Sequence, residues 1–181
     1  MRYRRAKIEG GTYFFTVITE GRQPIFKDAS AVALFETGLS RIRERHPFEV
    51  DAYVILPEHI HMLWTLPAGD ADYSKRWRLI KEAFTKSSVR HDAPQRSESR
   101  RAKSEQAIWQ RRFWEHVIRD ESDFCEHEDY IHSDPVRHGL VSAAQDWPHS
   151  SFSEWVRCGA YEPHWGSGDM PPLPEWAARS E

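Results

Sequence analysis

The alternation of apolar and polar residues predicts β-strands in the first half of the chain. Gly10 and Gly11 precede the β-rich segment 12–19, and segment 51–56 has the same character. Pro57 and Glu58 suit a two-residue turn, from which segment 59–66 returns as the next strand. We therefore expect a β-hairpin centred on this turn.

The returning strand has two different faces, because successive side chains of a strand point to opposite sides. One face carries large apolar side chains and is expected to face the core: Ile60, Met62, Trp64 and Leu66. The other face carries His59 and His61, followed by Leu63 and Thr65. The two imidazoles are expected to lie side by side away from the core, where a ligand can reach them.

Helical patterns follow these strands. Asp28 or Ser30 suits the N-cap of a helix to about residue 45, and segment 73–89 has the pattern of a basic amphipathic helix. After a strand at 113–118, Asp120 caps a helix to about residue 133, which Asp134 and Pro135 are expected to end. Segment 150–157 suits a short last helix. The order β-α-β-β-α-β-α predicts a ferredoxin-like α+β fold: an antiparallel sheet with helices on one face and the two histidines on a central strand.

Composition limits the class of protein. The chain has 181 residues, 39% hydrophobic and 29% charged, which suits one domain. Apolar runs such as 13–18 are too short for a membrane span or a signal peptide. The two cysteines, Cys125 and Cys158, indicate no disulfide framework and fit the cytoplasm. We expect one domain over residues 1–160. A tail over 161–181, rich in proline and tryptophan, is expected to dock through its aromatic residues or to order on a partner.

Charge is distributed unevenly, although the net value of −3 argues mildly against a nucleic-acid partner. Segment 73–119 holds 13 Lys and Arg against 5 Asp and Glu, and it includes a basic loop at 90–103. Segment 120–134 holds 7 acidic residues without any Lys or Arg. This arrangement fits phosphate binding beside a metal centre, and unrelated solvated faces are the alternative.

One combination of residues suggests a specific chemistry. His59 and His61 share a strand face, while Tyr130 and Asp134, four residues apart, share a helix face. If that helix packs on that strand, three metal ligands and one nucleophile converge. A bare His-x-His is common by chance, and Tyr130 alone reads as a core tyrosine. The nucleotide-hydrolase pattern His-x-His-x-His has Leu63 at its third position, and neither cysteine has a partner suited to a zinc site.

Longer segments carry a family resemblance. They lie at residues 2–5, 13–16, 52–61, 109–116, 130–141, 146–148 and 150–152, and include the stretches YVILPEHIH, WQRRFWEH and YIHSDPVRHGLV. In this combination the chain resembles the REP-associated tyrosine transposases, a branch of the IS200-like, single-tyrosine HUH transposases. The resemblance covers most of the chain.

The resemblance implies roles for the site residues. His59 and His61 would hold a divalent metal, Mg²⁺ or Mn²⁺, and Tyr130 would attack single-stranded DNA to form a 5′-phosphotyrosine, with no nucleotide cofactor. His127 or His132 is a candidate assisting base. The third ligand, four residues after the tyrosine, is Gln in the wider family and usually Asn in this branch. Here it is Asp134, whose carboxylate suits these metals and adds a negative charge near the scissile phosphate.

The resemblance also implies a partner, single-stranded DNA beside a REP-type hairpin. The expected DNA contacts are Arg2, Arg4, Arg5, Lys75, Arg78, Lys81, Lys86, Arg100, Arg101, Arg111 and Arg112. The wider family is dimeric, whereas this branch tends toward monomers, and the place of action would be the bacterial nucleoid in the cytoplasm. Two alternatives remain open: a hairpin-binding protein that has lost catalysis, for which Asp134 is the sequence support, and a small metallohydrolase that does not act on DNA.

Overall fold

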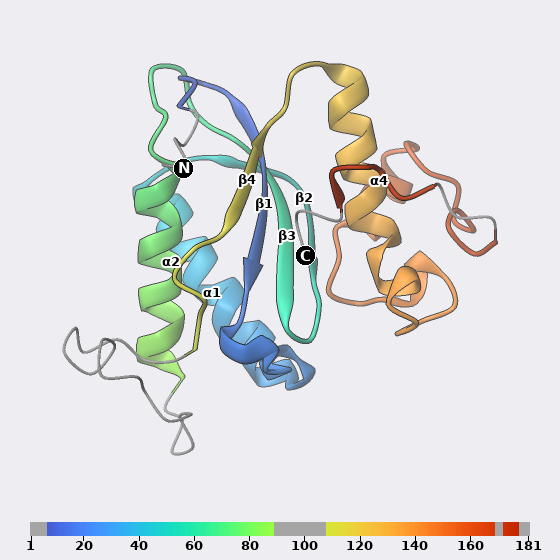
Figure 1. Cartoon of the computed structure of the whole chain (residues 1–181), viewed down its shortest axis with the longest axis horizontal. Coiled ribbons are helices and arrows are strands. Elements are labelled where there is room, and N and C mark those ends of the chain that lie inside the picture. The colour runs from blue at the N-terminus through green and yellow to red at the C-terminus, as the bar shows by residue number, and fades with distance from the viewer. Residues whose placement is uncertain (1–6, 89–107, 169–171, 178–181) are drawn as a thin grey trace.

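A four-stranded antiparallel sheet forms the centre of the protein (Figure 1), whose computed structural model describes residues 7–88, 108–168 and 172–177. The strand order is β2-β3-β1-β4. The strands are β1 (Thr12–Ile18), β2 (Glu49–Ile55), β3 (His59–Thr65) and β4 (Trp114–Val117). The β2–β3 hairpin turns at Pro57 and Glu58, as expected, and β3 lies between β2 and β1. The two histidines of β3 are therefore on a central strand.

Two of the three longer helices, α1 (Ala29–Arg45) and α4 (Glu121–Arg137), begin at side-chain caps that the sequence indicated. The third is α2 (Tyr73–Ser87). Asp28 accepts the N–H of Ser30 before α1, and Asp120 accepts the N–H of Asp123 before α4. A short helix, α5 (Phe152–Arg157), and three 3-10 turns, Glu20–Arg22, Ile25–Lys27 and Ala144–Asp146, complete the described elements. None of the described helices has both the length and the apolar character needed to cross a membrane.

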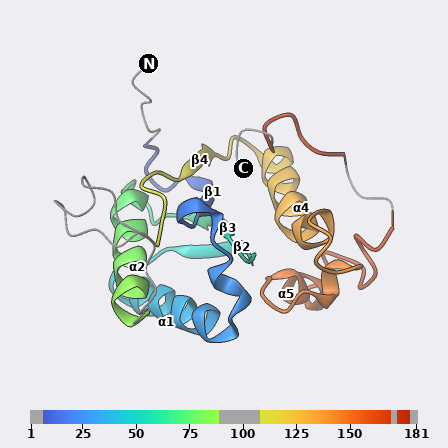
Figure 2. The same ribbon diagram turned by 60° about the horizontal axis from the view of Figure 1, so that its bottom comes forward.

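Helices α1 and α2 cover one face of the sheet (Figure 2). The core on this face contains the side chains of Tyr13, Phe15 and Val17 from β1 and of Ile60, Met62 and Trp64 from β3. The ring of Trp64 stacks on Trp77 of α2 with centroids 4.4 Å apart. The face of β3 that the apolar pattern assigned to the core is therefore buried against these two helices.

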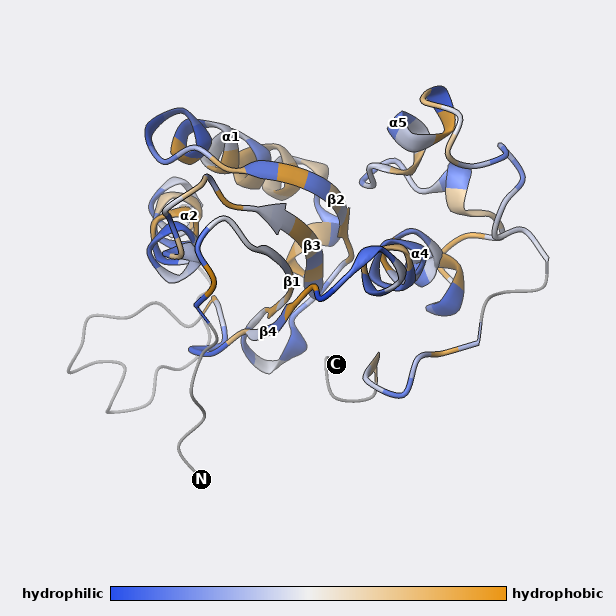
Figure 3. Cartoon of the chain, turned by 90° about the horizontal axis from the view of Figure 1, so that it is seen from above, coloured by the Kyte–Doolittle hydropathy of each residue, from blue (hydrophilic) through white to orange (hydrophobic). Residues whose placement is uncertain are grey.

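Helix α4 covers the opposite face, so the helices do not all lie on one side of the α+β fold (Figure 3). A second apolar cluster joins Phe14, Val54 and Leu63 of the sheet to Tyr130 and Ile131 of α4. The reason lies in β1, where consecutive aromatic residues place apolar rings on both faces. The expectation that the histidines of β3 lie away from the core is wrong, because α4 leaves His59 1% and His61 0% exposed.

Pro135 lies inside α4, whereas the sequence placed the end of the helix at Asp134. Proline lacks only its own N–H, so the bond to the carbonyl four residues earlier is lost while later bonds remain available. The N–H of His138 still donates to the carbonyl of Asp134 at 2.9 Å. This extra turn brings His138 onto the helix face of Asp134.

The segment after α4 is tied to the edge strand β2. The Ser151 hydroxyl accepts the backbone N–H of Tyr53 at 2.9 Å, and the indole of Trp147 donates to the carbonyl of Ile55 at 3.0 Å. Further on, Tyr161 donates to Asp129 of α4 at 2.7 Å, and Trp176 packs into the second apolar cluster. The described part of the tail therefore docks on α4 through aromatic side chains.

We expect the buried Glu128 of α4 to make the stability of the folded protein depend on pH. Its side chain is buried, its Oε1 has no hydrogen-bond partner among the described residues, and burial raises its pKa from 4.5 to about 7. Between pH 4.5 and about 7, the folded protein therefore binds one more proton than the unfolded chain. The free energy of unfolding falls as the pH rises through this window. Glu128→Gln cannot ionise, and we expect it to be more stable than the parent at pH 8 by about 1–2 kcal/mol, with the gain absent near pH 4.

Urea unfolding at both pH values measures this difference. Glu154→Gln is the matched control, because the Glu154 side chain on α5 is 64% exposed. A gain at Glu128 that is equal at pH 4 and pH 8 contradicts the prediction.

Candidate metal centre and nucleophile

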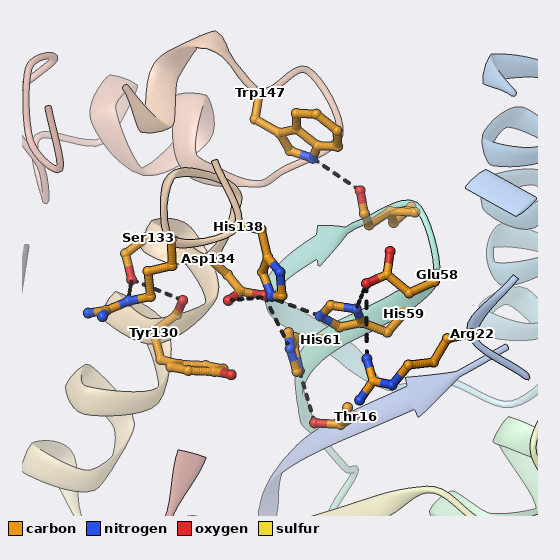
Figure 4. A network of polar contacts seen from close by, with 12 residues as sticks. Thr16, Arg22, Glu58, His59, His61, Tyr130, Ser133, Asp134, His138 and Trp147 are labelled. Carbon is orange, nitrogen blue, oxygen red and sulfur yellow. Dashed lines mark hydrogen bonds and ion pairs between the residues drawn. The ribbon is translucent and has the colours of Figure 1, made fainter. Parts of the chain in front are cut away.

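Strand β3 orients the two histidines toward α4. His61 lies opposite Thr16 of β1 in the antiparallel register, and its Nδ1 is 2.9 Å from the Thr16 hydroxyl oxygen. This contact directs Nε2 of His61 away from β1, to 3.3 Å from Oδ2 of Asp134. Nε2 of His59 lies 3.4 Å from the same oxygen. Both imidazoles therefore offer Nε2 to one carboxylate from the neighbouring layer (Figure 4).

Glu58 in the hairpin turn holds the other nitrogen of His59. Its Oε1 lies 3.3 Å from Nδ1 of His59 and 4.0 Å from a guanidinium nitrogen of Arg22. A carboxylate on the second nitrogen of a metal-binding histidine fixes the orientation and tautomer of the ring. Glu58 and Thr16 were not singled out in the sequence. Glu58 directly precedes His59, which is a signal, whereas the pairing of Thr16 with His61 requires the strand register.

Asp134 completes a donor set that fits a divalent metal. The ligand atoms of His59, His61 and Asp134 lie within 4.8 Å of one another, and all three side chains are buried. Neighbouring ligands of an octahedral ion at about 2.1 Å are about 3 Å apart, and the Nε2–Oδ2 separations of 3.3 and 3.4 Å approach this value. Imidazole nitrogen with carboxylate oxygen is a donor set that Mn²⁺ and Mg²⁺ accept.

The electrostatics of this group also favour a cation. Burial raises the pKa of Asp134, but the hydrogen bonds from His59 and His61 outweigh it and hold the pKa well below its usual range. Burial lowers the pKa of His59, but its contacts with Asp134 and Glu58 outweigh burial and raise it to about 9. A positive charge between the histidines and the carboxylates is therefore stabilised at neutral pH, whether a proton or a metal ion carries it.

Tyr130 lies one helical turn before Asp134 on the same face of α4. Its ring centroid is 5.2 Å from that of His61, and its hydroxyl end points toward the His61 side of the site (Figure 4). The centroid of the Tyr130 ring also lies 6.1 Å from that of Phe14 and 4.9 Å from that of Trp176. This packing leaves Tyr130 1% exposed. The structure therefore brings together the four residues that the sequence singled out: Tyr130, His59, His61 and Asp134.

His138 is a further residue at this site that the sequence reasoning missed. Its Nε2 lies 3.5 Å from Oδ1 of Asp134, and its ring centroid is 5.2 Å from that of His59. The side chain is 30% exposed, so it lies at the solvent side of the group. The spacing of four residues from Asp134 was visible in the sequence, but the expected helix end at Pro135 hid it.

The two candidate assisting bases lie in different places. His132 faces α5, where its Nε2 is 2.8 Å from the Ser151 hydroxyl, and burial lowers its pKa to about 3. It is thus neutral and turned away from Tyr130. His127 shares the helix face of Tyr130, and burial lowers its pKa to about 4. Its Nδ1 donates to the carbonyl of Asp123 at 2.7 Å.

A second group of metal-ligand type surrounds His127. His116, Asp123 and His127 have ligand atoms within 4.8 Å of one another. The Asp123 carboxylate already accepts hydrogen bonds from the Arg119 side chain at 3.0 Å and from His116 at 2.9 Å. These three side chains therefore already belong to an ion-paired network at the start of α4.

The expected DNA contacts are spread over more than one layer. Lys75, Arg78 and Lys86 are exposed on α2, on the side of the sheet opposite α4, and Arg78 pairs with Glu82 at 2.9 Å. Lys81 is partly buried and donates to the carbonyl of Gln110 at 3.1 Å. Arg111 and Arg112 are exposed just before β4. Arg2, Arg4, Arg5, Arg100 and Arg101 lie outside the described residues.

Comparisons with known proteins identify close relatives. The chain is 41% identical over 168 residues to the REP-associated tyrosine transposase of Escherichia coli (strain K12), which covers 93% of this chain and 92% of the relative. It is 40% identical over 164 residues to a protein of Haemophilus influenzae assigned to the same family, covering 91% and 92% of the two chains. No family model matches the chain.

A solved structure also matches closely in fold. It is that of a REP-associated tyrosine transposase bound to a REP hairpin, with a TM-score of 0.77 and 39% sequence identity. The match covers 96% of this chain and 94% of the other. The similarity thus extends over nearly the whole length of both proteins.

Proposed function

The chain belongs to the family of REP-associated tyrosine transposases, which are DNA endonucleases and strand transferases, and from this premise we propose that it cuts single-stranded DNA beside REP-type palindromic hairpins in a metal-dependent reaction. One observation carries the proposal. Tyr130 lies in the same buried group as His59, His61 and Asp134, although these residues come from two layers of the fold.

Tyr130 is the nucleophile in this proposal. Its phenol oxygen forms a bond to phosphorus while the bond between phosphorus and the 3′ oxygen breaks, which leaves a free 3′-OH and a 5′-phosphotyrosine. The covalent bond conserves the energy of the phosphodiester, so the 3′-OH can reverse the step or join another end without a nucleotide cofactor. A phenol with a pKa of about 10 is a poor nucleophile at neutral pH. Proton loss from Tyr130 therefore needs positive charge nearby.

His59, His61 and Asp134 would hold the divalent metal, Mg²⁺ or Mn²⁺. The metal supplies stabilisation of the charge that develops on the phosphate oxygens. Glu58 and Thr16 keep the histidine rings in position through their Nδ1 atoms. Asp134 adds one negative charge compared with the amide usual in this branch, which favours metal binding and weakens the net pull on the phosphate.

We propose that the protein acts as a monomer, in the bacterial nucleoid. All four residues of the site come from one chain, and α4 delivers Tyr130 and Asp134 together. The site is thus complete without a tyrosine from a second copy. We also propose that residues 1–160 form the catalytic domain and that 161–181 are an appended tail.

The exposed basic side chains of α2, which are Lys75, Arg78 and Lys86, are assigned to the phosphates of the hairpin stem. They are exposed on the layer opposite α4, away from the residues that meet the scissile phosphate. We expect hairpin affinity to fall steeply with salt, because each neutralised phosphate releases bound counterions. The double variant Lys75→Glu and Lys86→Glu should reduce the slope of log K against log salt by about 1 for each phosphate that is no longer neutralised.

Filter binding over a range of salt concentrations measures this slope. Arg157→Glu is the control, since Arg157 lies on α5 and its side chain is 74% exposed. A parent protein with salt-independent affinity contradicts the assignment, and so does an equal change in the control.

Incubation of the protein with a hairpin oligonucleotide that carries single-stranded flanks, in the presence of Mn²⁺, tests the proposed function. A covalent adduct that resists denaturation is expected, with the 5′-phosphate on the peptide that contains Tyr130. Hairpin binding without any adduct supports a binding protein that has lost catalysis. Phosphate-ester hydrolysis by a Tyr130→Phe variant supports a metallohydrolase.

A further inference from the structure

An indole from the C-terminal tail fills a slot beside the proposed nucleophile. The ring of Trp176 lies flat on the imidazole of His127, with centroids 3.9 Å apart and an interplanar angle of 6°. It also lies parallel to Trp114 of β4 at 6.0 Å and edge-on to Tyr130 at 4.9 Å. The rings of His127, Trp114 and Tyr130 therefore form a site that accepts one flat aromatic ring system.

A carboxylate stands at the edge of this slot. The indole N–H of Trp176 donates to Oε1 of Glu126 at 3.1 Å. Glu126 is exposed on α4 and precedes Tyr130 by four residues, so it shares the helix face of the nucleophile. The slot thus combines a stacking surface with an acceptor for ring N–H groups.

We propose that this slot binds one unpaired nucleobase of the DNA, and that the preferred base is guanine. The inference rests on the function proposed above, because it takes DNA as the substrate. Aromatic side chains stack on any base, so the His127 and Trp114 rings alone would give little discrimination. Specificity comes from the size of the slot and from Glu126.

Guanine matches both features of the bound indole. Both are bicyclic, so a purine retains the stacking area that a pyrimidine loses. Guanine presents two adjacent donors, N1–H and the N2 amino group, to the two oxygens of one carboxylate, whereas the indole offers a single N–H. Adenine presents an amino group beside the acceptor N1, which a carboxylate repels. A bidentate pair of this kind discriminates between bases by about 10- to 100-fold.

The place of the slot relates the base to the reaction. The centroid of the Trp176 ring lies 4.9 Å from that of the Tyr130 ring, so a base in place of Trp176 lies directly beside the nucleophile. The bound base therefore belongs to a nucleotide that flanks the phosphate attacked by Tyr130. The base replaces Trp176, and both the stacking on His127 and the hydrogen bond to Glu126 are retained in the exchange.

A binding selection tests this inference without any cleavage. The full chain is equilibrated in EDTA with hairpin oligonucleotides whose single-stranded flanks are randomised, and the bound fraction is sequenced. Guanine should be enriched by about 10-fold or more at one flanking position. Glu126→Gln should change the preference at that position to adenine, because a glutamine amide pairs bidentately with adenine. Glu121→Gln removes the same charge from an exposed position of the same helix and should leave the guanine preference unchanged.

The selection separates this inference from the proposed function. Equal use of the four bases at every flanking position overturns the slot, and so does a guanine preference that persists in Glu126→Gln. Both results leave adduct formation with Mn²⁺ unaffected. Conversely, a protein that shows the guanine-to-adenine change and forms no adduct has the slot but lacks the proposed activity.

Discussion

Replacing Tyr130 with phenylalanine should reduce the rate of covalent adduct formation with single-stranded DNA by about 1,000-fold or more, while hairpin binding persists. The substitution removes the only atom that can form the bond to phosphorus in the proposed reaction, and loss of a nucleophile reduces turnover by several orders of magnitude. The ring packs against His61, Phe14 and Trp176, and phenylalanine retains these contacts. We expect the free energy of unfolding to change by no more than about 1.5 kcal/mol, the net value of one hydrogen bond.

Denaturing gels of labelled oligonucleotide in Mn²⁺ measure the adduct, and urea unfolding measures the stability. Tyr161→Phe is the matched control, because Tyr161 packs on α4 through its bond to Asp129, at the side of His132 and away from the metal group. It should retain the adduct. Adduct formation by Tyr130→Phe, with the DNA found on Tyr53 or Tyr73, contradicts the mechanism.

The strands and the site residues were predictable because short-range rules decide them. Alternation fixes which side chains of β3 share a face, and a spacing of four residues fixes that Tyr130 and Asp134 share a helix face. These two rules require only local backbone geometry. The convergence of the two pairs was conditional in the sequence, since no local pattern states that α4 packs on β3.

The packing of α4 on the sheet was harder to predict, because α4 buries polar side chains. His127, Glu128, His132 and Asp134 are all buried, so the apolar pattern of the helix does not show which face meets the sheet. The consecutive rings of Tyr13, Phe14 and Phe15 were the better signal, since apolar residues on both faces of a strand indicate a cover on both sides. That signal gives the burial of His59 and His61 as well.

The end of α4 shows the limit of a local rule. Proline disfavours the helical conformation of the residue before it, yet tertiary contacts hold Asp134 in the helix between His59 and His61. The position of Trp176 depends on contacts over 50 residues with α4, which no spacing rule reaches. The slot beside Tyr130 was therefore visible only in the folded chain.

Replacing His61 with alanine should abolish both metal binding and adduct formation. His61 provides one of the three donor atoms, and the pair that remains, His59 and Asp134, should hold Mn²⁺ only weakly. A metal that binds only the folded protein stabilises it by about 2.7 kcal/mol at a concentration of 100 times Kd. We expect this Mn²⁺-dependent gain in the free energy of unfolding for the parent protein and its loss in His61→Ala.

Asp134→Asn is the informative comparison, because it restores the amide usual in this branch. One neutral ligand replaces one charged ligand, so Mn²⁺ should bind more weakly, while adduct formation at saturating Mn²⁺ should persist. His61→Ala should give no adduct at any Mn²⁺ concentration and should still bind the hairpin in EDTA. Equal Mn²⁺ stabilisation of the parent and of His61→Ala would place the metal elsewhere, and equal loss of hairpin binding would indicate misfolding of the variant. The two substitutions together thus separate the need for a metal from the need for a carboxylate at this position.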